Sequence, residues 1–405
     1  MKDLLLSGDF FPMIGGAHHW LYNLYSRWSN PVTVFAGSQP IGSVDSNEQQ
    51  NIFDSRNHGS LLIRRIDLSI DDISIFNYAF WKTLLTAVRL ISAETGNSQA
   101  TLHCLRAFPE GILGLAWKAL APRRRRIVTF AHGEEITVAR SSRQLQAFSC
   151  LVYGISDLVV ANSLNTETLV HSLVPSAKTT VVHPGVAPAD FVFPKEELER
   201  CRTFYGFERD DVVLVTVARM EARKNHANVL KALRYLLDFG LRLKYLIVGG
   251  GEEEQNLRNM SGNLCLEHAV RFAGVLPDQE RSLAMALADI HIMPSINYSV
   301  VFEGFGIVFL EAAAAGIPSI AGNTGGQTEA VIDGRTGFIV DGTNLDAIIG
   351  AVRQLAENRQ LRYDMGTFGR QWAAAHEWHT LVAKTNQAIY GSGCEKYSSN
   401  GCEQK

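Results

Sequence analysis

Apolar residues gather in short uninterrupted runs along the chain, and glycine-rich or polar segments separate these runs. Runs of this length and composition are typical of strands that a parallel sheet buries on both faces. Between the runs, apolar residues recur at helical spacing, as they do from Trp20 to Trp28. The runs that predict strands are 4–7, 31–36, 101–105, 127–131, 158–161, 179–182, 212–218, 244–248, 269–273, 289–293 and 317–321.

The alternation of strand and helix occurs in both halves of the chain. It predicts an α/β fold with two Rossmann-like, doubly wound domains that face a cleft, where a ligand is expected. Prolines between 184 and 194 and the charged run 195–202 indicate a link between the two halves. We therefore expect an acceptor-binding domain over 1–190 and a nucleotide-binding domain over 191–371. A C-terminal helix over 372–390 is expected to return to the first domain, followed by a disordered polar tail over 391–405.

Residues 303–311, with the sequence Glu-Gly-Phe-Gly-Ile-Val-Phe-Leu-Glu, carry the strongest chemical signal. Four alanines and Gly316 follow, so a glycine loop is expected to open into a helix. The N-terminus of such a helix favours a phosphate, and two acceptor-only carboxylates beside it would hold hydroxyl groups. This combination points to a sugar nucleotide. An ordinary buried helix with two solvated glutamates also fits this stretch when it is taken alone.

Composition narrows the class of protein. The chain has 405 residues, of which 46% are apolar and 20% charged, so it is globular and long enough for two or three domains. A net charge of −3 gives no argument for a nucleic-acid partner. The six cysteines are scattered and show no zinc spacing, so no metal site is expected. The first residues have too short an apolar run for a signal peptide, which indicates a cytoplasmic protein.

Three features of the first half allow two interpretations each. Gly15-Gly16 follows a predicted strand and is either a phosphate-binding turn or a plain tight turn. His132 ends another strand and is either a site residue or a structural histidine. The run Arg123, Arg124, Arg125 and Arg126 is either a solvated turn or a contact with anionic lipid headgroups or an anionic acceptor.

The order of motifs in the second half resembles the retaining GT-B glycosyltransferases, in particular the large family four group. The glutamate pair with Gly-Phe-Gly between its members is the central element of this resemblance, which is strong over 210–342 and looser in the first half. The other matching elements are Ala-Arg-Met-Glu-Ala-Arg-Lys-Asn at 218–225, Gly-Gly-Gly at 249–251, Phe-Ala-Gly-Val-Leu-Pro at 272–277, Pro-Ser at 294–295, Gly-Gly at 325–326 and Asp-Gly-Arg-Thr-Gly at 333–337.

The resemblance implies a role for individual residues. Arg219 and Lys224 would hold the diphosphate, and Glu303 would bind hydroxyls of the transferred sugar. Glu311 would accept from the ribose, and His132 would lie near the sugar. Residues 275–277 would border the nucleotide base, and the glycines at 249–251 would leave room nearby. The residues that would serve catalysis are His132, Arg219, Lys224 and Glu303. The donor-binding set is Gly16, Arg219, Lys224, Gly249, Val275, Leu276, Glu303, Gly304, Phe305, Gly306, Ile307 and Glu311.

The expected protein is therefore a retaining, metal-independent hexosyltransferase without a cofactor. Its donor would be a UDP-sugar, with UDP-glucose as the candidate, and its acceptor a polysaccharide, oligosaccharide or glycolipid at the inner face of the membrane. Asn225 departs from the commoner glycine after the lysine of the basic loop. A non-catalytic sugar-nucleotide-binding subunit is the alternative. A dinucleotide oxidoreductase is a third reading, but the chain lacks Gly-x-Gly-x-x-Gly after its first strand.

Overall fold

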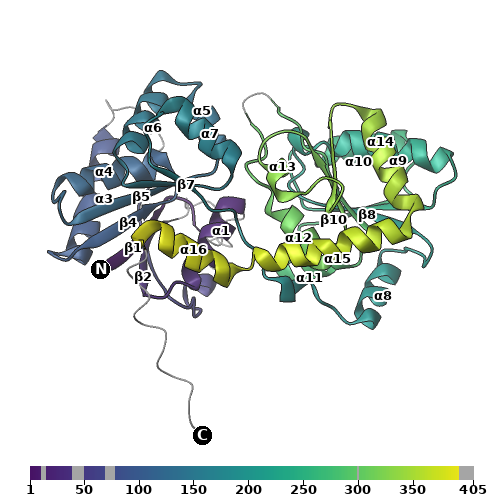
Figure 1. Cartoon of the computed structure of the whole chain (residues 1–405), viewed down its shortest axis with the longest axis horizontal. Helices are drawn as coiled ribbons and strands as arrows, with labels where there is room; N and C mark the ends of the chain where they lie inside the picture. The colour runs from purple at the N-terminus through teal and green to yellow at the C-terminus, as the bar shows by residue number, and fades with distance from the viewer. Residues whose placement is uncertain (11–14, 39–49, 69–77, 299–300, 392–405) are drawn as a thin grey trace, which may run out of the picture. The chain divides into compact units, whose positions relative to one another are not determined.

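The computed structural model describes residues 1–10, 15–38, 50–68, 78–298 and 301–391, coloured along the chain in Figure 1. The chain divides into two compact units. Unit 1 comprises Met1–His183 together with Trp378–Lys405, and unit 2 comprises Pro184–Glu377. The tail predicted to be disordered, from 392 onward, lies outside the described residues.

Unit 1 is built on a parallel sheet of seven described strands in the order β3-β2-β1-β4-β5-β6-β7. Side chains of β1 alternate between its faces: Leu4 and Leu6 belong to a core formed with α3, α4, α6 and α7. The strands are β1 (Lys2–Ser7), β2 (Val32–Gly37), β3 (Leu61–Ile66), β4 (Ala100–Cys104), β5 (Arg125–Ala131), β6 (Leu158–Ala161) and β7 (Thr179–Val181). The helices are α1 (Gly16–Ser26), α3 (Tyr78–Thr95), η1 (Ala107–Gly111), α4 (Ile112–Ala119), α5 (Glu134–Ala139), α6 (Arg143–Ile155), α7 (Leu164–Leu173) and α16 (Trp378–Tyr390).

The last helix of the chain packs on the first unit. In α16 the Tyr390 hydroxyl donates to the buried Asp3 carboxylate on β1. The Arg126 guanidinium donates to the carbonyl oxygen of Ile389 at 3.1 Å. The helix starts at Trp378 rather than at 372, because α15 (Arg359–Ala375) ends just before it in unit 2.

The arginine run is only partly exposed. Arg125 opens β5, where its guanidinium lies over the Trp117 ring and donates to the Trp117 carbonyl oxygen at 2.5 Å. Arg126 is held by α16. Of the two interpretations left open for this run, neither a solvated turn nor a membrane contact describes Arg125 and Arg126, because their guanidinium groups bind within the fold. Arg123 and Arg124 remain exposed.

Unit 2 repeats the architecture with a parallel sheet of six described strands in the order β10-β9-β8-β11-β12-β13. Its cores lie on the two faces of this sheet. The strands are β8 (Val212–Val217), β9 (Leu243–Val248), β10 (Val270–Gly274), β11 (Ile290–Met293), β12 (Ser319–Gly322) and β13 (Gly337–Val340). The helices are η2 (Pro188–Phe191), α8 (Lys195–Phe204), η3 (Ala222–Lys224), α9 (His226–Asp238), α10 (Glu254–Asn263), α11 (Asp278–Ala286), α12 (Ile307–Ala315), α13 (Gln327–Ala330), α14 (Leu345–Glu357) and α15.

The division between the units falls a few residues before the predicted boundary at 190. Phe191 in η2 is buried in a core of unit 2, so the proline-containing segment belongs to that unit instead of forming a free linker. The backbone N–H of Val186 donates to the carbonyl oxygen of His376 at 3.0 Å, which joins the first and last segments of unit 2.

None of the helices in the described parts of the chain has both the length and the apolar character that crossing a membrane requires.

Candidate functional site

The glycine loop opens into a helix as predicted. Gly306 is the N-cap of α12 and has a φ of 86°, a left-handed conformation that favours glycine. A Cβ at this position would lie 2.6 Å from the Phe309 ring. The first turn of α12 leaves backbone N–H groups without intrahelical partners, and the positive end of the helix dipole lies there. The loop at 303–306 therefore leads into a helix N-terminus suited to an anion.

A second glycine pair holds this loop in place. The backbone N–H of Gly326 donates to the Glu303 carbonyl oxygen at 2.9 Å. A Cβ at Gly325 would lie 2.3 Å from that oxygen, and one at Gly326 would lie 2.0 Å from the Gly304 carbonyl oxygen. The two segments approach so closely that neither glycine can carry a side chain without displacing the loop.

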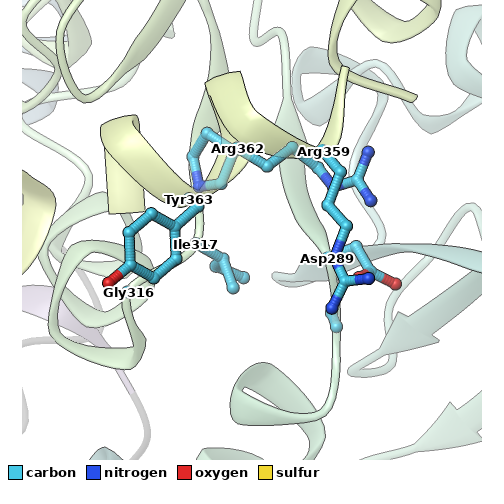
Figure 2. A pocket seen from close by; sticks show the side chains of 8 residues that line it. Asp289, Gly316, Ile317, Arg359, Arg362 and Tyr363 are labelled. Carbon is cyan, nitrogen blue, oxygen red and sulfur yellow. The ribbon is translucent and has the colours of Figure 1, made fainter. Parts of the chain in front are cut away.

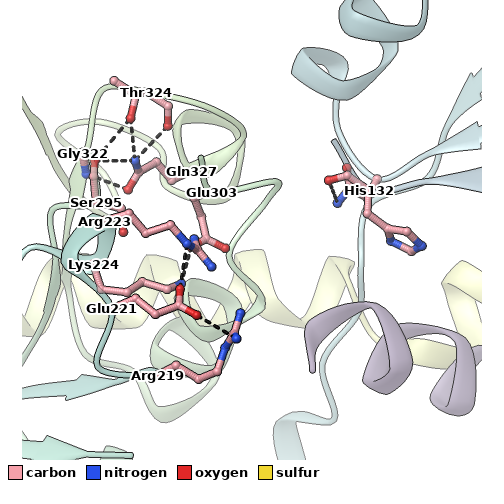
Figure 3. A network of polar contacts seen from close by, with 11 residues as sticks. His132, Arg219, Glu221, Arg223, Lys224, Ser295, Glu303, Gly322, Thr324 and Gln327 are labelled. Carbon is pink, nitrogen blue, oxygen red and sulfur yellow. Dashed lines mark hydrogen bonds and ion pairs between the residues drawn. The ribbon is translucent and has the colours of Figure 1, made fainter. Parts of the chain in front are cut away.

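The basic segment after β8 meets Glu303 directly (Figure 3). The Lys224 ammonium pairs with the Glu303 carboxylate, and the Arg223 guanidinium donates to the same oxygen, Oε2, at 3.0 Å. Burial raises the pKa of Glu303, but the charges of Lys224 and Arg223 outweigh it and hold that pKa below its usual value. Glu303 is therefore a fixed carboxylate that only accepts hydrogen bonds.

Arg219 occupies the outer end of the same ion-pair chain (Figure 3). Its Nη1 lies 2.7 Å from Glu221 Oε1, and Glu221 Oε2 lies 2.8 Å from the Nε of Arg223. The Arg219 side chain is 63% exposed, whereas that of Lys224 is 10% exposed. Three cations face two carboxylates here, so the group carries one surplus positive charge. Sequence reasoning did not single out Glu221 or Arg223, although both lie inside the basic motif.

Asn225 stands where glycine is commoner, and it can adopt the backbone conformation that this position requires. Its φ is 64°, in the left-handed region that glycine adopts freely and asparagine more readily than most residues. Its side-chain amide donates to the carbonyl oxygens of Pro294 at 3.0 Å and Gly342 at 2.7 Å. The left-handed turn therefore explains both the usual glycine and the asparagine found in this chain.

Glu311 lies in α12 and has a partner that the sequence did not indicate. The Nη1 of Arg281 in α11 lies 2.7 Å from Glu311 Oε2. Glu311 is 6% exposed, so this charge-assisted hydrogen bond satisfies a carboxylate that is mostly removed from water. Arg281 follows the segment 275–277, which the resemblance assigns to the nucleotide base.

The glycines after β9 serve close packing. A Cβ at Gly249 would lie 2.0 Å from the Ala218 carbonyl oxygen, and one at Gly251 would lie 2.5 Å from the Met220 carbonyl oxygen. These glycines therefore let the loop after β9 pack against the basic segment. The resemblance had instead implied that they leave room for the nucleotide base. Of the two residues predicted to border the base, Val275 is exposed and Leu276 is half-buried.

In unit 1, His132 follows β5 and its ring packs edge-on against Trp20 at 5.5 Å. Its Nε2 lies 2.8 Å from the Leu105 carbonyl oxygen, which can only accept, so Nε2 carries the proton and Nδ1 is an acceptor. Burial lowers the pKa of His132 to about 4. The imidazole is therefore neutral at physiological pH and can accept a hydrogen bond from a hydroxyl group. Gly16 begins α1 and is exposed.

A further polar group in unit 1 lies near His132. Both ring nitrogens of His18 are buried and have no hydrogen-bond partner among the described residues. Burial and, to a smaller extent, the positive charge of Arg106 lower the pKa of His18 to about 4. Arg106 pairs in turn with Asp9. Sequence reasoning missed His18 because its environment depends on strands far away in the chain.

One pocket of unit 2, shown in Figure 2, lies at the opposite edge of its sheet. It has a volume of about 180 Å³ and is bounded by the segments that precede β11 and β12. Its polar groups already serve the fold: Asp289 accepts from the backbone N–H of Val213 at 2.8 Å, and Arg362 donates to the Leu355 carbonyl oxygen at the end of α14 at 2.6 Å. Ligands of open parallel sheets bind beyond the carboxyl ends of strands, so this pocket is not the candidate site.

No cluster of three or more metal-binding side chains occurs within the described ranges.

Comparison with known proteins decides the family. The family model for glycosyl transferases group 1 matches residues 199–372. A GDP-mannose-dependent alpha-(1-6)-phosphatidylinositol monomannoside mannosyltransferase of Mycolicibacterium smegmatis is 34% identical over 295 residues, which cover 70% of this chain and 75% of the relative. The chain belongs to the group 1 glycosyltransferases. The N-acetyl-alpha-D-glucosaminyl L-malate synthase of Bacillus anthracis is 28% identical over 75% of this chain and 77% of that relative.

Solved structures support the fold of this group 1 glycosyltransferase. Anabaena HepE in complex with UDP and glucose superposes with a TM-score of 0.76 over 96% of this chain and 99% of HepE, at 18% identity. The sucrose-phosphate synthase of Thermosynechococcus elongatus has a TM-score of 0.73 and also 18% identity, with 96% of this chain and 98% of that chain covered. The prediction of a GT-B α/β fold with two Rossmann-like domains is confirmed, as is that of a glycosyltransferase.

Proposed function

We propose that this glycosyltransferase moves a hexose from a nucleotide-diphospho-sugar to a lipid-linked or other carbohydrate acceptor, with unit 2 binding the donor and unit 1 the acceptor. One observation carries the donor assignment. Glu303 lies in the loop that enters α12, Glu311 lies within α12, and the chain of ion pairs that starts at Glu303 ends at the exposed Arg219. Cations and a helix N-terminus suit a diphosphate, and fixed carboxylates suit hydroxyl groups.

Charge stabilisation of the leaving group is the chemistry that this arrangement supports. Breaking the glycosidic bond passes through an oxocarbenium-like state and leaves negative charge on the diphosphate. Lys224 and the first turn of α12 would stabilise that charge without reorganising, because the fold already holds Lys224 in place. Donor binding would draw Arg219 from Glu221 to the diphosphate, since its side chain is the exposed member of the group.

Each unit offers a hydrogen-bond acceptor for a hydroxyl group, and the two acceptors differ in electrostatic state. Glu303 is kept ionised by Lys224 and Arg223. His132 is kept neutral by burial and presents Nδ1 as an acceptor. We propose net retention through a substitution on one face of the sugar, in which the departing phosphate accepts the proton of the acceptor hydroxyl. Neither a metal ion nor a cofactor enters this proposal.

The names of the relatives provide the candidates for the base and the sugar of the donor. Two relatives, 34% and 31% identical over 70% and 67% of the chain, are named GDP-mannose-dependent alpha-(1-6)-phosphatidylinositol monomannoside mannosyltransferases. GDP-mannose is therefore our first candidate, and the UDP-glucose expected from the sequence is the second. An inositol-containing glycolipid is the corresponding acceptor candidate.

A thermal-shift and calorimetric panel tests the donor proposal. The purified chain would be titrated with GDP, UDP and ADP, then incubated with GDP-mannose or UDP-glucose without an acceptor. We expect one nucleotide to raise the unfolding temperature, and slow hydrolysis of its sugar to show that the protein is an enzyme. Binding without any hydrolysis of the donor would support the non-catalytic alternative. Absence of binding to all three nucleotides would contradict the proposal.

A lipid acceptor would require peripheral membrane contact, for which α3 is the best candidate surface. Tyr78, Trp81 and Leu85 are 81%, 49% and 52% exposed and recur at helical spacing, with Lys82 and Arg89 on the same side. Aromatic, apolar and basic residues on one face are typical of a helix that lies in a membrane interface. Cosedimentation with vesicles containing phosphatidylinositol should fall in Trp81→Glu. Equal cosedimentation of this variant and the wild type would refute the contact.

A further inference from the structure

We infer that Arg281 is a positioning residue for nucleotide recognition, because it orients the Glu311 carboxylate toward the ribose of the donor. The inference rests on the proposed function, which assigns the ribose to Glu311. It adds a residue and a mechanism that neither the sequence motifs nor the resemblance indicated. Its consequence is that Arg281 sets how strongly the enzyme distinguishes ribose from deoxyribose.

The geometry joins two parts of the nucleotide site. Arg281 lies in the first turn of α11, and its backbone N–H donates to the Pro277 carbonyl oxygen at 2.8 Å. Its side chain reaches the next helix, where Nη1 lies 2.7 Å from Glu311 Oε2. One residue therefore connects the segment 275–277 with the carboxylate in α12.

Burial makes this contact more than a surface ion pair. The side chains of Arg281 and Glu311 are 23% and 8% exposed, so water competes weakly for either charge. The Glu311 charge raises the pKa of Arg281, and burial opposes that shift. The neighbouring Asp278 lies 3.6 Å from Arg281 Nη2 but is 90% exposed, so Glu311 is the main partner. A partner of this kind restricts the rotamer of the glutamate.

A carboxylate has about four lone-pair positions, and Arg281 engages the Oε2 end of Glu311. The remaining positions suffice for the two hydroxyl groups of a ribose. With Arg281 in place, these lone-pair positions point in a fixed direction. The Glu311 side chain therefore loses little rotamer freedom when it binds a ribose. Without Arg281, the glutamate would have to be ordered by the ligand, which weakens binding.

The test compares nucleotide affinities in Arg281→Gln with those of the wild type. Calorimetric titrations would use GDP and UDP, and then the 2′,3′-dideoxy form of whichever nucleotide binds. We expect the wild type to prefer the ribonucleotide by at least about tenfold, the scale of one charge-assisted hydrogen bond. In Arg281→Gln that preference should fall below about threefold, while the dideoxynucleotide binds as it does to the wild type. Arg281→Lys, which keeps one charged donor, should restore part of the preference.

Arg353→Gln is the matched control. Arg353 also pairs with a glutamate in unit 2, at 3.3 Å from Glu357 within α14, where both side chains are about half exposed. This variant should keep the full ribose preference. If Arg281→Gln folds and keeps the full ribose preference of the wild type, the inference about Arg281 is overturned while the proposed function stands. If Arg281→Gln does not fold, the same result in Arg281→Lys overturns it. A wild type that binds the nucleotide without any ribose preference would also remove Glu311 from the ribose. A wild type that binds neither GDP nor UDP would instead contradict the proposed function.

Discussion

Replacing Lys224 with methionine separates the electrostatic and structural parts of the proposed site. Lys224→Met keeps most of the side-chain volume and removes the charge. The ammonium pairs with Glu303, and both side chains are nearly buried, at 10% and 12% exposed. If Lys224 stabilises the leaving diphosphate, the loss of one preorganised contact should lower kcat by about 10²–10³-fold.

The same variant should also unfold more easily, but to a limited extent. Glu303 would keep Arg223 at 3.0 Å from the same oxygen, so its carboxylate would not be left without a partner. A buried acceptor that loses one of its charged donors costs about 1–3 kcal/mol of unfolding free energy. Chemical denaturation would measure this cost, and turnover would be measured under conditions where both proteins are folded.

Lys231→Met provides the comparison. Lys231 is an exposed residue of α9 that contacts Asn228 within its own helix, so this variant removes one positive charge from the same unit. Its turnover and stability should match those of the wild type. A Lys224→Met enzyme with wild-type turnover would refute the role of Lys224 in leaving-group stabilisation, even if its stability were reduced.

Two further predictions concern the loop and the buried histidines. Gly326→Ala should weaken nucleotide binding at least about tenfold, because the new Cβ would lie 2.0 Å from the Gly304 carbonyl oxygen and displace the loop. Gly350→Ala, in α14 with no atom within 4 Å of the new Cβ, should leave binding unchanged and serves as the calorimetric control. Burial lowers the pKa of His132 and His226 to about 4, so below about pH 6.5 the unfolded chain binds more protons than the folded one. The unfolding free energy should therefore fall as pH decreases from about 6.5 to about 4, by up to about 1.4 kcal/mol per pH unit for each histidine. Urea titrations at several pH values should show a shallower dependence for His226→Gln, and an unchanged slope would contradict the assignment.

The sequence was sufficient to predict those structural features whose physical cause lies within a few neighbouring residues. The buried apolar runs predicted the parallel strands apart from β3 and β13, and the glycine loop followed by alanines predicted the start and end of α12. Lys224 and Glu303 were both singled out from motifs, and the structure brings them into contact. Such features follow from backbone preference and from apolar runs within a few neighbouring residues. The family and the GT-B fold could accordingly be predicted from the sequence. The roles assigned to single residues stay predictions.

Tertiary structure decided the partners of the charged residues. Arg281 and Glu311 lie 30 positions apart, and Arg223 and Glu303 lie 80 apart, so the packing of separate helices and loops determines each pair. Packing also turned Arg125 into the fold and drew Phe191 into unit 2. The sequence alone determined most strands, loops and helices, because those choices depend on near neighbours, but it did not indicate β3, which is only partly buried. The charge state and orientation of the site residues depend on burial and on distant counter-charges, which exist only once the chain has folded.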